Sequence, residues 1–467
     1  MIYSYYLDFL FIYLDLLLVT LTNFILSCII FMNKFMIPSW RDAKTLESKE
    51  IEHLMKIAHI APPWITIPPK GYGGTESVIY YLVEELVTLG HDVTLFAPAD
   101  AKTSAKLVSF YPLSLREEGV PWQGHLKAFY HLYKAVEYAK THCFDIVHVH
   151  LSSSADMYVF PLVTSLATPI IATLHTPFPF DYVQSWTGDA DKYYMEWLSR
   201  VPTVAISQSV CAQVPHPLQF IDVVHHGLPM DVFKPMVEHP ENFLVWLGRI
   251  TPEKGTHLAI EAAKAAHMPL VLAGTVDSHL TVQVTYFEEM IKPHIDQQQI
   301  KYIGPVNAQQ KIDLLSRAWG MLNPIQWEEP FGIVMLEAMS VGCPVIAIAR
   351  GAAPEIISHG TSGFLVQDVQ EMIQYVPRLG ELDRRKVRAH AEQNFSTRMM
   401  AEKYVKVYKR AALALREPSP PKVAVKARSV SALSTPLRNS VLGFKAQELS
   451  SSASGATTAS EVEEEQL

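Results

Sequence analysis

Apolar residues in the middle of the chain form short unbroken runs that alternate with longer stretches of helical spacing. The run at 56–61 (KIAHIA) predicts a buried strand. The segment 75–89 predicts an amphipathic helix, because its apolar residues recur every three or four positions from Val78 to Leu89. Gly90 then ends the helix, and 92–96 predicts the next strand. These segments make one βαβ unit.

The same alternation continues, pauses once and restarts. Further strands are expected at 146–149, 169–174, 201–206 and 222–224, and then at 243–247, 270–273, 301–303, 321–323, 344–349 and 363–366. Helices are expected near 257–266, 309–318 and 332–341. The pause at 228–242 has the proline and charge content of a linker. Alternating strands and helices predict parallel sheets, so the fold class is α/β with two Rossmann-like domains, at 55–229 and 230–416. Ligands of such sheets bind beyond the carboxyl ends of the strands, in a cleft between the domains.

The two ends of the chain differ from its middle. Residues 16–33 carry no charge and are long enough to cross a bilayer as a helix, and basic residues follow them. Two interpretations of 1–54 stay open: a membrane anchor that leaves the domains in the cytosol, or upstream sequence translated from a misplaced start, since Met55 opens the first strand. The tail 417–467 is rich in Pro, Ser, Ala and Thr and is expected to be disordered.

Composition argues against a nucleic-acid-binding protein and against a metal site built from cysteines. Hydrophobic residues make up 49%, which suffices for two cores, and 39 Lys and Arg face 47 Asp and Glu. That acidic balance argues against nucleic acid as a partner, which would require a basic face. The four cysteines (Cys28, Cys143, Cys211 and Cys343) show no metal-ligand spacing and are expected to be buried, reduced and apolar in character, in a cytoplasmic protein.

Two loops that follow strands carry chemistry suited to phosphate. Gly73, Gly74 and Glu76 lie in the loop GYGGTE before the first helix, where glycines let backbone N–H groups approach an anion. A plain glycine turn with Thr75 as N-cap explains the same letters. The second loop, GRITPEKG, places Arg249 and Lys254 five residues apart, so both cations could reach one diphosphate; an ion-paired surface loop is the alternative.

A third segment, EPFGIVMLE, places two carboxylates around the start of a predicted helix. Glu329 precedes the helix, which begins near Phe331 or Gly332, and Glu337 lies inside it. The free N–H groups at this helix start, around Phe331, Gly332 and Ile333, would face phosphate, and the carboxylates would accept hydrogen bonds from sugar and ribose hydroxyls.

These three loops together resemble the retaining glycosyltransferases of family four, which have the GT-B fold of two Rossmann-like domains. The resemblance covers 55–415 and is supported by FDIVHVH (144–150), TLHTP (173–177), VVHHGLPMDVFKP (223–235) and GAAPEII (351–357). The chain departs from the family pattern at His226, where the family has Asn, and at Ala352, where it often has Gly.

The resemblance implies a hexosyltransferase-type enzyme of carbohydrate biosynthesis, with a UDP- or GDP-sugar as donor, an unidentified carbohydrate, lipid or small-molecule acceptor, and no metal or other cofactor. Arg249 and Lys254 would hold the diphosphate, Glu329 the transferred sugar and Glu337 the ribose. Gly74 would offer backbone N–H groups, and His175 would line the sugar pocket.

Three other functions stay open on the sequence alone. One is a nucleotide-sugar epimerase of the same architecture, because a fold does not fix a reaction. The others are a non-catalytic nucleotide-sugar binder and a membrane-anchoring interaction protein. His148 and His150 point to one face of a strand and could bind a metal, but short motifs of this kind are more often packed or hydrogen-bonded histidines.

Overall fold

The computed structural model describes residues 54–71, 73–176, 200–214, 218–235, 237, 239–278 and 280–414, and every structural statement below concerns these ranges. The apolar run 16–33, the aromatic segment 178–186 and the tail 417–467 lie outside them. Within the described ranges, no helix combines the length and the apolar character that crossing a membrane requires.

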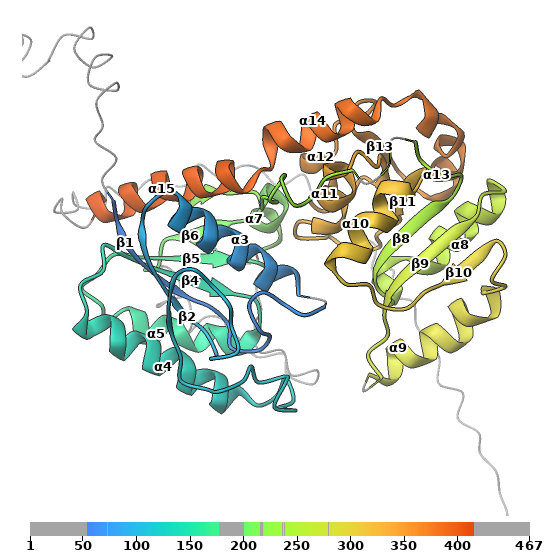
Figure 1. Ribbon diagram of the computed structural model, residues 1–467. Helices are drawn as coiled ribbons and strands as arrows, with labels where there is room; N and C mark the ends of the chain where they lie inside the picture. The colour runs from blue at the N-terminus through green and yellow to red at the C-terminus, as the bar shows by residue number, and fades with distance from the viewer. Residues whose placement is uncertain are drawn as a thin grey trace, which may run out of the picture. The chain divides into compact units, whose positions relative to one another are not determined.

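The first half of the chain forms a seven-stranded parallel sheet with the order β3-β2-β1-β4-β5-β6-β7 (Figure 1). Its strands are β1 (Lys56–Ile60), β2 (Asp92–Phe96), β3 (Lys106–Val108), β4 (Ile146–Leu151), β5 (Ile170–Leu174), β6 (Thr203–Ala205) and β7 (Phe220–Val223). Its helices are α3 (Gly74–Thr88), α4 (His125–Thr141), α5 (Val159–Val163) and α7 (Gln208–Gln213). The short unbroken apolar runs form its central strands, as expected for strands that are covered on both faces.

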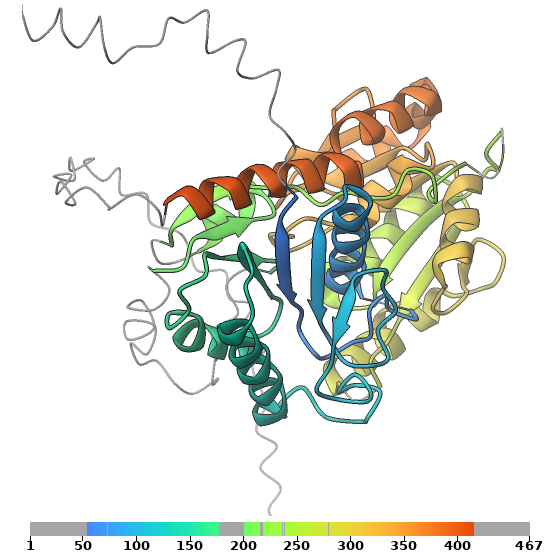
Figure 2. The same cartoon turned by 60° about the vertical axis from the view of Figure 1, so that its left-hand side comes forward.

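The two faces of this sheet differ because successive side chains of a strand point to opposite sides. Ala58 and Val147 pack with α4 in one core cluster, whereas Ile57 and Ile146 pack with α3 in another. The helix α15 (Thr397–Ala414) lies beside α3 on that second face, as Figure 2 shows. His59 of β1 and His148 and His150 of β4 therefore lie on the face that α15 covers.

The second half forms a six-stranded parallel sheet with the order β10-β9-β8-β11-β12-β13. Its strands are β8 (Leu244–Arg249), β9 (Leu270–Thr275), β10 (Ile300–Tyr302), β11 (Gly320–Asn323), β12 (Val345–Ile348) and β13 (Gly363–Val366). The helices α8 (Thr256–Ala265) and α13 (Val369–Tyr375) cover one face, and α10 (Ala308–Arg317), α11 (Ile333–Ser340) and α14 (Arg384–Asn394) cover the other. Short helices α9 (Thr281–Tyr286) and α12 (Ala353–Ile356) lie in the connections. The predicted fold of two Rossmann-like α/β domains is confirmed.

The chain passes between the halves at two places that are hydrogen-bonded to each other. The Leu228 N–H donates to the carbonyl of Phe395 over 2.9 Å, and the Thr397 N–H donates to the carbonyl of Leu228 over 3.0 Å. After the second passage α15 packs on the first sheet, although it lies within the range 230–416 expected for the second domain. Its apolar stripe (Met400, Ala401, Tyr404, Val407, Tyr408) is buried there because α3 leaves that part of the sheet uncovered.

The cysteines follow the expected pattern only in part. Cys343 is buried, and its burial raises the pKa of the thiol to about 11. Cys211 is half-buried and Cys143 is exposed, so the expectation that all are buried is wrong. Cys143 lies in the connection between α4 and β4, where the chain turns at the surface. Cys28 lies outside the described residues.

Candidate active site

Loops at the carboxyl ends of the strands line two adjoining hollows. The smaller one, the inner pocket, is lined by Gly71, Gly73, Gly74, Ser77, Leu247, Gly248, Gly274, Thr275, Pro305, Val306, Lys311, Ile333, Val334 and Glu337. The larger one, the outer cleft, shares Gly73, Gly74, Thr275 and Ile333 with it. The outer cleft also contains Glu76, His175, Arg249, Lys254, Glu329, Phe331 and Gly332. Every site residue predicted from the sequence thus lines one hollow or the other.

Two helices begin at the boundary between the inner pocket and the outer cleft. α3 begins at Gly74, with Gly73 at its N-cap, so the alternative of Thr75 as N-cap is wrong. α11 begins at Ile333, and a Cβ added to Gly74 would lie 3.7 Å from the Ile333 side chain. The first N–H groups of a helix lack intrahelical partners and carry partial positive charge. The shared wall is therefore suited to an anion.

The loop 248–255, which carries Arg249 and Lys254 and is called the cation loop, is held by its backbone against the sheet of the second half. Arg249 is the last residue of β8, and Lys254 ends a short 3₁₀ turn over Pro252–Lys254. Gly255 follows with φ of +68°, and a Cβ there would lie 2.0 Å from the carbonyl oxygen of Pro324. This left-handed and closely packed position requires glycine. It turns the chain sharply into α8 directly after Lys254.

Glu329 is an ion-pair partner of the cation loop. The Lys254 ammonium donates to its carboxylate, and the indole N–H of Trp327 donates to the same oxygen over 2.9 Å. The side chains of Lys254 and Glu329 are only 16% and 12% exposed. A charge-assisted bond that is shielded from solvent is stronger than a surface pair. Lys254 and Glu329 therefore act as one unit, and a ligand that recruits either group alters both.

Glu337 is the buried carboxylate of the inner pocket. Its Oε1 accepts from the Lys311 ammonium over 2.5 Å, whereas its Oε2 is buried and has no partner among the described residues. A buried carboxylate oxygen without a donor is costly, and it is satisfied when a ligand hydroxyl donates to it. The pocket thus contains an acceptor that is ready for a hydroxyl group.

Glu76 is a carboxylate whose charge is opposed by its surroundings. It lies in the first turn of α3 and is 5% exposed. Burial raises its pKa to about 7, helped by the charge of Asp156, although its own backbone N–H acts in the opposite direction. Near neutral pH this group therefore exists in both protonation states, unlike an ordinary surface glutamate.

Gly332 and Phe331 shape the start of α11. Gly332 has φ of +80°, and a Cβ there would lie 2.5 Å from Met335 Cε. Phe331 is buried, and its ring centroid lies 4.7 Å from that of His226. The residue that departs from the family pattern, His226, therefore packs directly on the predicted helix start.

His175 enters the outer cleft just beyond β5 and is hydrogen-bonded on its inner side. Its Nε2 lies 3.0 Å from Nδ1 of His150, and its ring stacks on His226 at 5.2 Å. Burial lowers the pKa of His175 to about 3, so the ring is neutral at physiological pH. It can form hydrogen bonds in the cleft but does not supply positive charge there.

Several lining residues were missed from the sequence. Lys311 comes from α10, which carries no motif, and the packing of α10 beside α11 brings it to Glu337. Trp327 lies two residues before Glu329, so an aromatic next to paired acids was a usable signal. Arg116 and Trp122 line the outer cleft from the first half, with the guanidinium 5.4 Å from the ring centroid. Both come from a loop whose sequence lacks a recognisable pattern.

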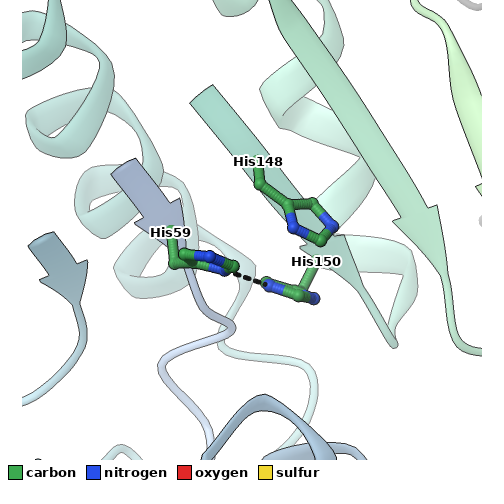
Figure 3. Close-up of side chains that lie close together, drawn as sticks. All are labelled: His59, His148 and His150. Carbon is green, nitrogen blue, oxygen red and sulfur yellow. Dashed lines mark hydrogen bonds between the residues drawn. The ribbon is translucent and has the colours of Figure 1, made fainter. Parts of the chain in front are cut away.

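The histidines of β4 have a third neighbour. His59 of β1 joins His148 and His150 (Figure 3), and one ring nitrogen of each lies within 4.8 Å of the others. His148 and His150 share a face, as the strand period predicts, with ring centroids 4.1 Å apart. Both nitrogens of His148 already pair with hydroxyls, those of Tyr408 and Thr173. Hydrogen bonding therefore accounts for His148 without a metal.

Comparison with known proteins adds a family to this geometry. Residues 72–232 match the model described as Glycosyltransferase Family 4, and residues 231–397 match the model described as Glycosyl transferases group 1. The boundary between the two matches coincides with the passage between the two halves. Both halves of the outer cleft are therefore covered by glycosyltransferase models.

Three similar proteins are matched over nearly all of their own length. Spore coat protein SA of Bacillus subtilis (strain 168) is 22% identical over 406 residues, which cover 76% of this chain and 100% of the relative. AviGT4, a glycosyltransferase involved in avilamycin A biosynthesis, is 24% identical with a TM-score of 0.56, covering 77% of this chain and 98% of its own. HepE of Anabaena in complex with UDP is 20% identical with a TM-score of 0.57, covering 76% of this chain and 100% of its own. At these identities the solved structures establish the shared fold.

Proposed function

Because this chain is a glycosyltransferase with the GT-B fold, we propose that it transfers a hexose from a UDP- or GDP-sugar to an acceptor with retention of anomeric configuration. The observation that carries the proposal is the convergence of Arg249, Lys254, Glu329 and two helix starts on one cleft, beside the pocket of Glu337. A structural relative in complex with UDP supports a nucleotide as the ligand.

The order of chemical groups along the two hollows matches the order of groups in such a donor. A nucleoside fits the inner pocket, where the open Oε2 of Glu337 would accept from a ribose hydroxyl. The diphosphate fits the shared wall, at the N-termini of α3 and α11. The sugar then reaches the outer cleft, beside Glu329 and His175.

The cation loop is the source of rate acceleration in this proposal. When the bond between the anomeric carbon and the phosphate oxygen breaks, negative charge builds up on the departing diphosphate. Positive charge that is already in place stabilises that state without a reorganisation cost. Arg249 and Lys254 would supply this charge, and Lys254 would exchange Glu329 for phosphate. Glu329 would then be released to accept from a sugar hydroxyl.

Replacing the cation tests the proposal. Lys254→Ala and Arg249→Ala are each expected to lower kcat by roughly 10²–10³. Lys292→Ala is the matched control, because this lysine of the same half pairs with Glu288 at the exposed surface and does not line either hollow. Wild-type turnover in Lys254→Ala would refute the role.

Metal independence belongs to the same proposal. Two cations beside the phosphate position are chemically able to replace a divalent ion. Turnover measured in excess EDTA is therefore expected to equal turnover without it, whereas loss in EDTA and recovery with Mg²⁺ or Mn²⁺ would contradict it.

Retention is proposed from the family resemblance, which the spacing of Glu329 and Glu337 supports. The check is the configuration of the first product anomer by proton NMR. An inverted anomer would remove this part of the proposal and leave the donor site intact. Incubation with donor alone separates the epimerase alternative, because an epimerised nucleotide-sugar would be found instead of free nucleoside diphosphate.

The acceptor is expected to bind on the side of the outer cleft that the first half supplies. Trp122 is 43% exposed and lies there with Arg116. The exposed part of the indole can pack against a sugar ring, and the guanidinium beside it can donate hydrogen bonds to sugar hydroxyls. We therefore propose a carbohydrate-containing acceptor, and Trp122→Ala should raise KM for the acceptor while leaving hydrolysis of the donor unchanged.

A further inference from the structure

The inner pocket contains an ion pair whose partners come from two neighbouring helices. Lys311 lies near the start of α10, and Glu337 lies in the middle of α11. The Lys311 ammonium donates to Glu337 Oε1 over 2.5 Å, and both residues line the pocket. The side chain of Glu337 is 7% exposed and that of Lys311 is 23% exposed. The carboxylate end of the pair is therefore shielded from solvent, and the ammonium end can be reached by a ligand.

We propose that Lys311 is a specificity-determining residue that reads, together with Glu337, two neighbouring hydroxyl groups of a ribose. Glu337 accepts from one hydroxyl, and Lys311 donates to the oxygen of the other. The enzyme then takes a ribonucleotide-sugar as donor and rejects a dTDP-sugar, because the deoxyribose of the latter has only one free hydroxyl. This inference rests on the proposed function, which places the nucleoside in the inner pocket.

The hydrogen-bond acceptor of the pair is Oε2 of Glu337. This oxygen is buried and has no hydrogen-bond partner among the described residues. A buried carboxylate oxygen without a donor is costly, so a ligand that supplies a hydroxyl hydrogen there is favoured. Because Lys311 already occupies Oε1, the oxygen left for a ligand is Oε2. The second hydroxyl of a bound ribose therefore needs a different partner.

The hydrogen-bond donor of the pair is the ammonium of Lys311. An ammonium has three N–H groups and no acceptor. Within the part of the chain that the structure describes, it donates to Glu337 alone, so two N–H groups remain for a ligand. A hydroxyl oxygen is a suitable acceptor, and a hydrogen bond from a charged donor is stronger than a neutral one. Lys311 can therefore hold Glu337 and contact the ligand at the same time.

The start of α10 fixes Lys311 relative to the wall of the pocket. Asn307 Oδ1 accepts from the Gln310 N–H over 2.9 Å, and Gln310 Oε1 accepts from the Asn307 N–H over 3.0 Å. This reciprocal cap holds the first turn of the helix. Pro305 and Val306, which directly precede the cap, line the same pocket. Lys311 thus follows the pocket wall by a single capped turn, and α11 packs beside that helix.

A donor beside an acceptor matches a vicinal diol better than it matches a phosphate. Lys311 and Glu337 are the only charged residues among the described ones that line the inner pocket. A phosphate next to Lys311 would also meet the Glu337 carboxylate, which repels it. In a diol one hydroxyl donates while its neighbour accepts, so both protein groups are satisfied. A site built to bond a hydroxyl discriminates against an analogue that lacks it, because a polar group of the site is left unpaired.

Lys264 provides a matched control in the same half of the chain. It lies on the helix α8, and its ammonium lies 3.1 Å from Nδ1 of His294 at the surface. It lines neither the inner pocket nor the outer cleft. Substitution of a surface lysine of this kind changes stability little, so Lys264→Gln reports the effect of losing a helical lysine away from the site.

Binding to the wild-type protein is the first test, and it requires neither an acceptor nor turnover. Calorimetry compares UDP with its 2′-deoxy form and GDP with its 2′-deoxy form. For the nucleotide that binds, we expect the dissociation constant of the deoxy form to be at least about tenfold higher, the value of one lost hydrogen bond to a charged group. Equal constants for the two forms would overturn the proposal. Absence of binding by all four would remove the proposed function together with it.

Two variants then test Lys311 itself. Lys311→Met removes every donor, whereas Lys311→Gln keeps an N–H for Glu337 but has a shorter side chain without charge. We expect the ratio of the deoxy to the ribo dissociation constant to fall to about twofold or less in both variants, because the ligand loses its charged donor. Lys264→Gln should keep the wild-type ratio. If Lys311→Met fails to fold, Lys311→Gln decides alone.

The ratio separates a specificity role from a structural one. If Lys311 only stabilised the fold, its loss would weaken both nucleotides equally and leave the ratio intact, and that result would overturn the proposal. Glu337→Gln separates the proposal from the donor site. A ratio that falls in Glu337→Gln but not in Lys311→Gln would show that Glu337 reads the hydroxyls without Lys311, and the donor site would stand. Unchanged affinities in all variants would place the nucleotide outside the inner pocket and contradict both.

Discussion

The carboxylates of the site differ in their charged neighbours, and these neighbours determine the chemical role that each carboxylate can have. Glu329 and Glu337 are paired with lysines, so each can exchange a protein donor for a ligand donor. Glu76 has no ion-pair partner among the described residues, and burial and the charge of Asp156 both disfavour its ionised form. It is therefore the carboxylate whose protonation state responds to pH near neutrality.

Glu337→Gln tests the hydroxyl acceptor of the inner pocket. The amide keeps the shape but loses the charge, and hydrogen bonds to charged groups contribute about 1.5–3 kcal/mol. We expect the dissociation constant of the preferred nucleoside diphosphate, measured by calorimetry, to rise at least tenfold. The corresponding 2′,3′-dideoxynucleotide should bind both proteins equally, because it lacks the hydroxyls. An unchanged constant for the natural nucleotide would exclude Glu337 as the ribose partner.

Glu76→Gln tests the buried charge at the start of α3. The pKa of this carboxyl is raised from 4.5 to about 7, so its ionisation costs stability progressively as pH rises through that interval, and costs nothing below it. The variant should therefore be more stable than wild type at pH 8 by about 2–3 kcal/mol, with the gain fading toward pH 4.5. Denaturant unfolding at the two pH values checks this. Glu288→Gln, at the exposed surface, should show little change, and an equal gain at both pH values would contradict the account.

The site residues could be predicted from the sequence where they lie close to a glycine or proline that begins or ends a helix or strand. Arg249 and Lys254 lie between glycines after a strand, and Glu329 precedes the proline and glycine that start α11. Lys311 lies inside an ordinary helix, and its pairing with Glu337 depends on how α10 and α11 pack side by side. The pattern of a single helix contains no such information, so partners of this kind become visible only in three dimensions.

At the scale of elements, the site depends on turns that begin helices. The turn at Gly255 joins the cation loop to α8, and the turn at Gly332 joins Glu329 to α11. In both cases the backbone is left-handed close to a charged residue of the cleft: Gly255 directly follows Lys254, and Gly332 lies three residues after Glu329. The precision of Lys254 and Glu329 thus comes from backbone geometry as much as from their mutual ion pair.

Gly255→Ala tests this dependence, with Gly304→Ala as a control of similar backbone strain. Gly304 also has positive φ, of +73°, but a Cβ there meets no atom within 4 Å, whereas at Gly255 it would lie 2.0 Å from the Pro324 carbonyl. Both variants should lose about 1 kcal/mol from strain. Only Gly255→Ala should also lose turnover, by more than tenfold, because the collision displaces Lys254. Equal kinetics in the two variants would show that the turn does not position the cation.

The helix α15 stabilises the first sheet by hydrogen bonds to two of its buried polar side chains. Tyr408 and Tyr404 hydrogen-bond to His148 and Thr173, at 2.8 and 2.9 Å. Tyr408→Phe leaves His148 Nδ1 buried without its donor or acceptor, which should cost about 1–3 kcal/mol. Thermal unfolding of this variant should therefore occur at lower temperature than that of Tyr133→Phe, whose exposed ring is the control. Identical melting temperatures would show that this bond contributes nothing.

The order of strands and helices along the chain was largely predictable from the sequence. The sheet on which each helix packs was less predictable. Buried parallel strands read as unbroken apolar runs, and for this reason β2 and β13 have the bounds expected from the sequence. α4 was not predicted, although it buries Leu132 and Val136, because its stripe is interrupted by His131 and flanked by exposed aromatics. The return of α15 to the first sheet could not be read from the sequence, since its apolar stripe would suit either sheet.

At the scale of the whole molecule, two repeats of one architecture place complementary chemistry at the same ends of their strands. The first half contributes the glycine loop, His175 and Trp122, and the second contributes the cations and two of the acids. Either half alone would present an incomplete set. The chain passes between the halves at 228 and 396, and a β-bridge between Leu228 and Ser396 holds the two passages together.

A crystal structure of the protein with bound UDP or GDP, whichever calorimetry shows to bind, would test the donor site directly. We predict a ribose hydroxyl on Glu337, the diphosphate at the starts of α3 and α11, and the Lys254 ammonium turned from Glu329 to a phosphate oxygen. A nucleotide bound elsewhere, or one bound in the cleft with the Lys254–Glu329 pair intact and Glu337 without contact, would contradict it.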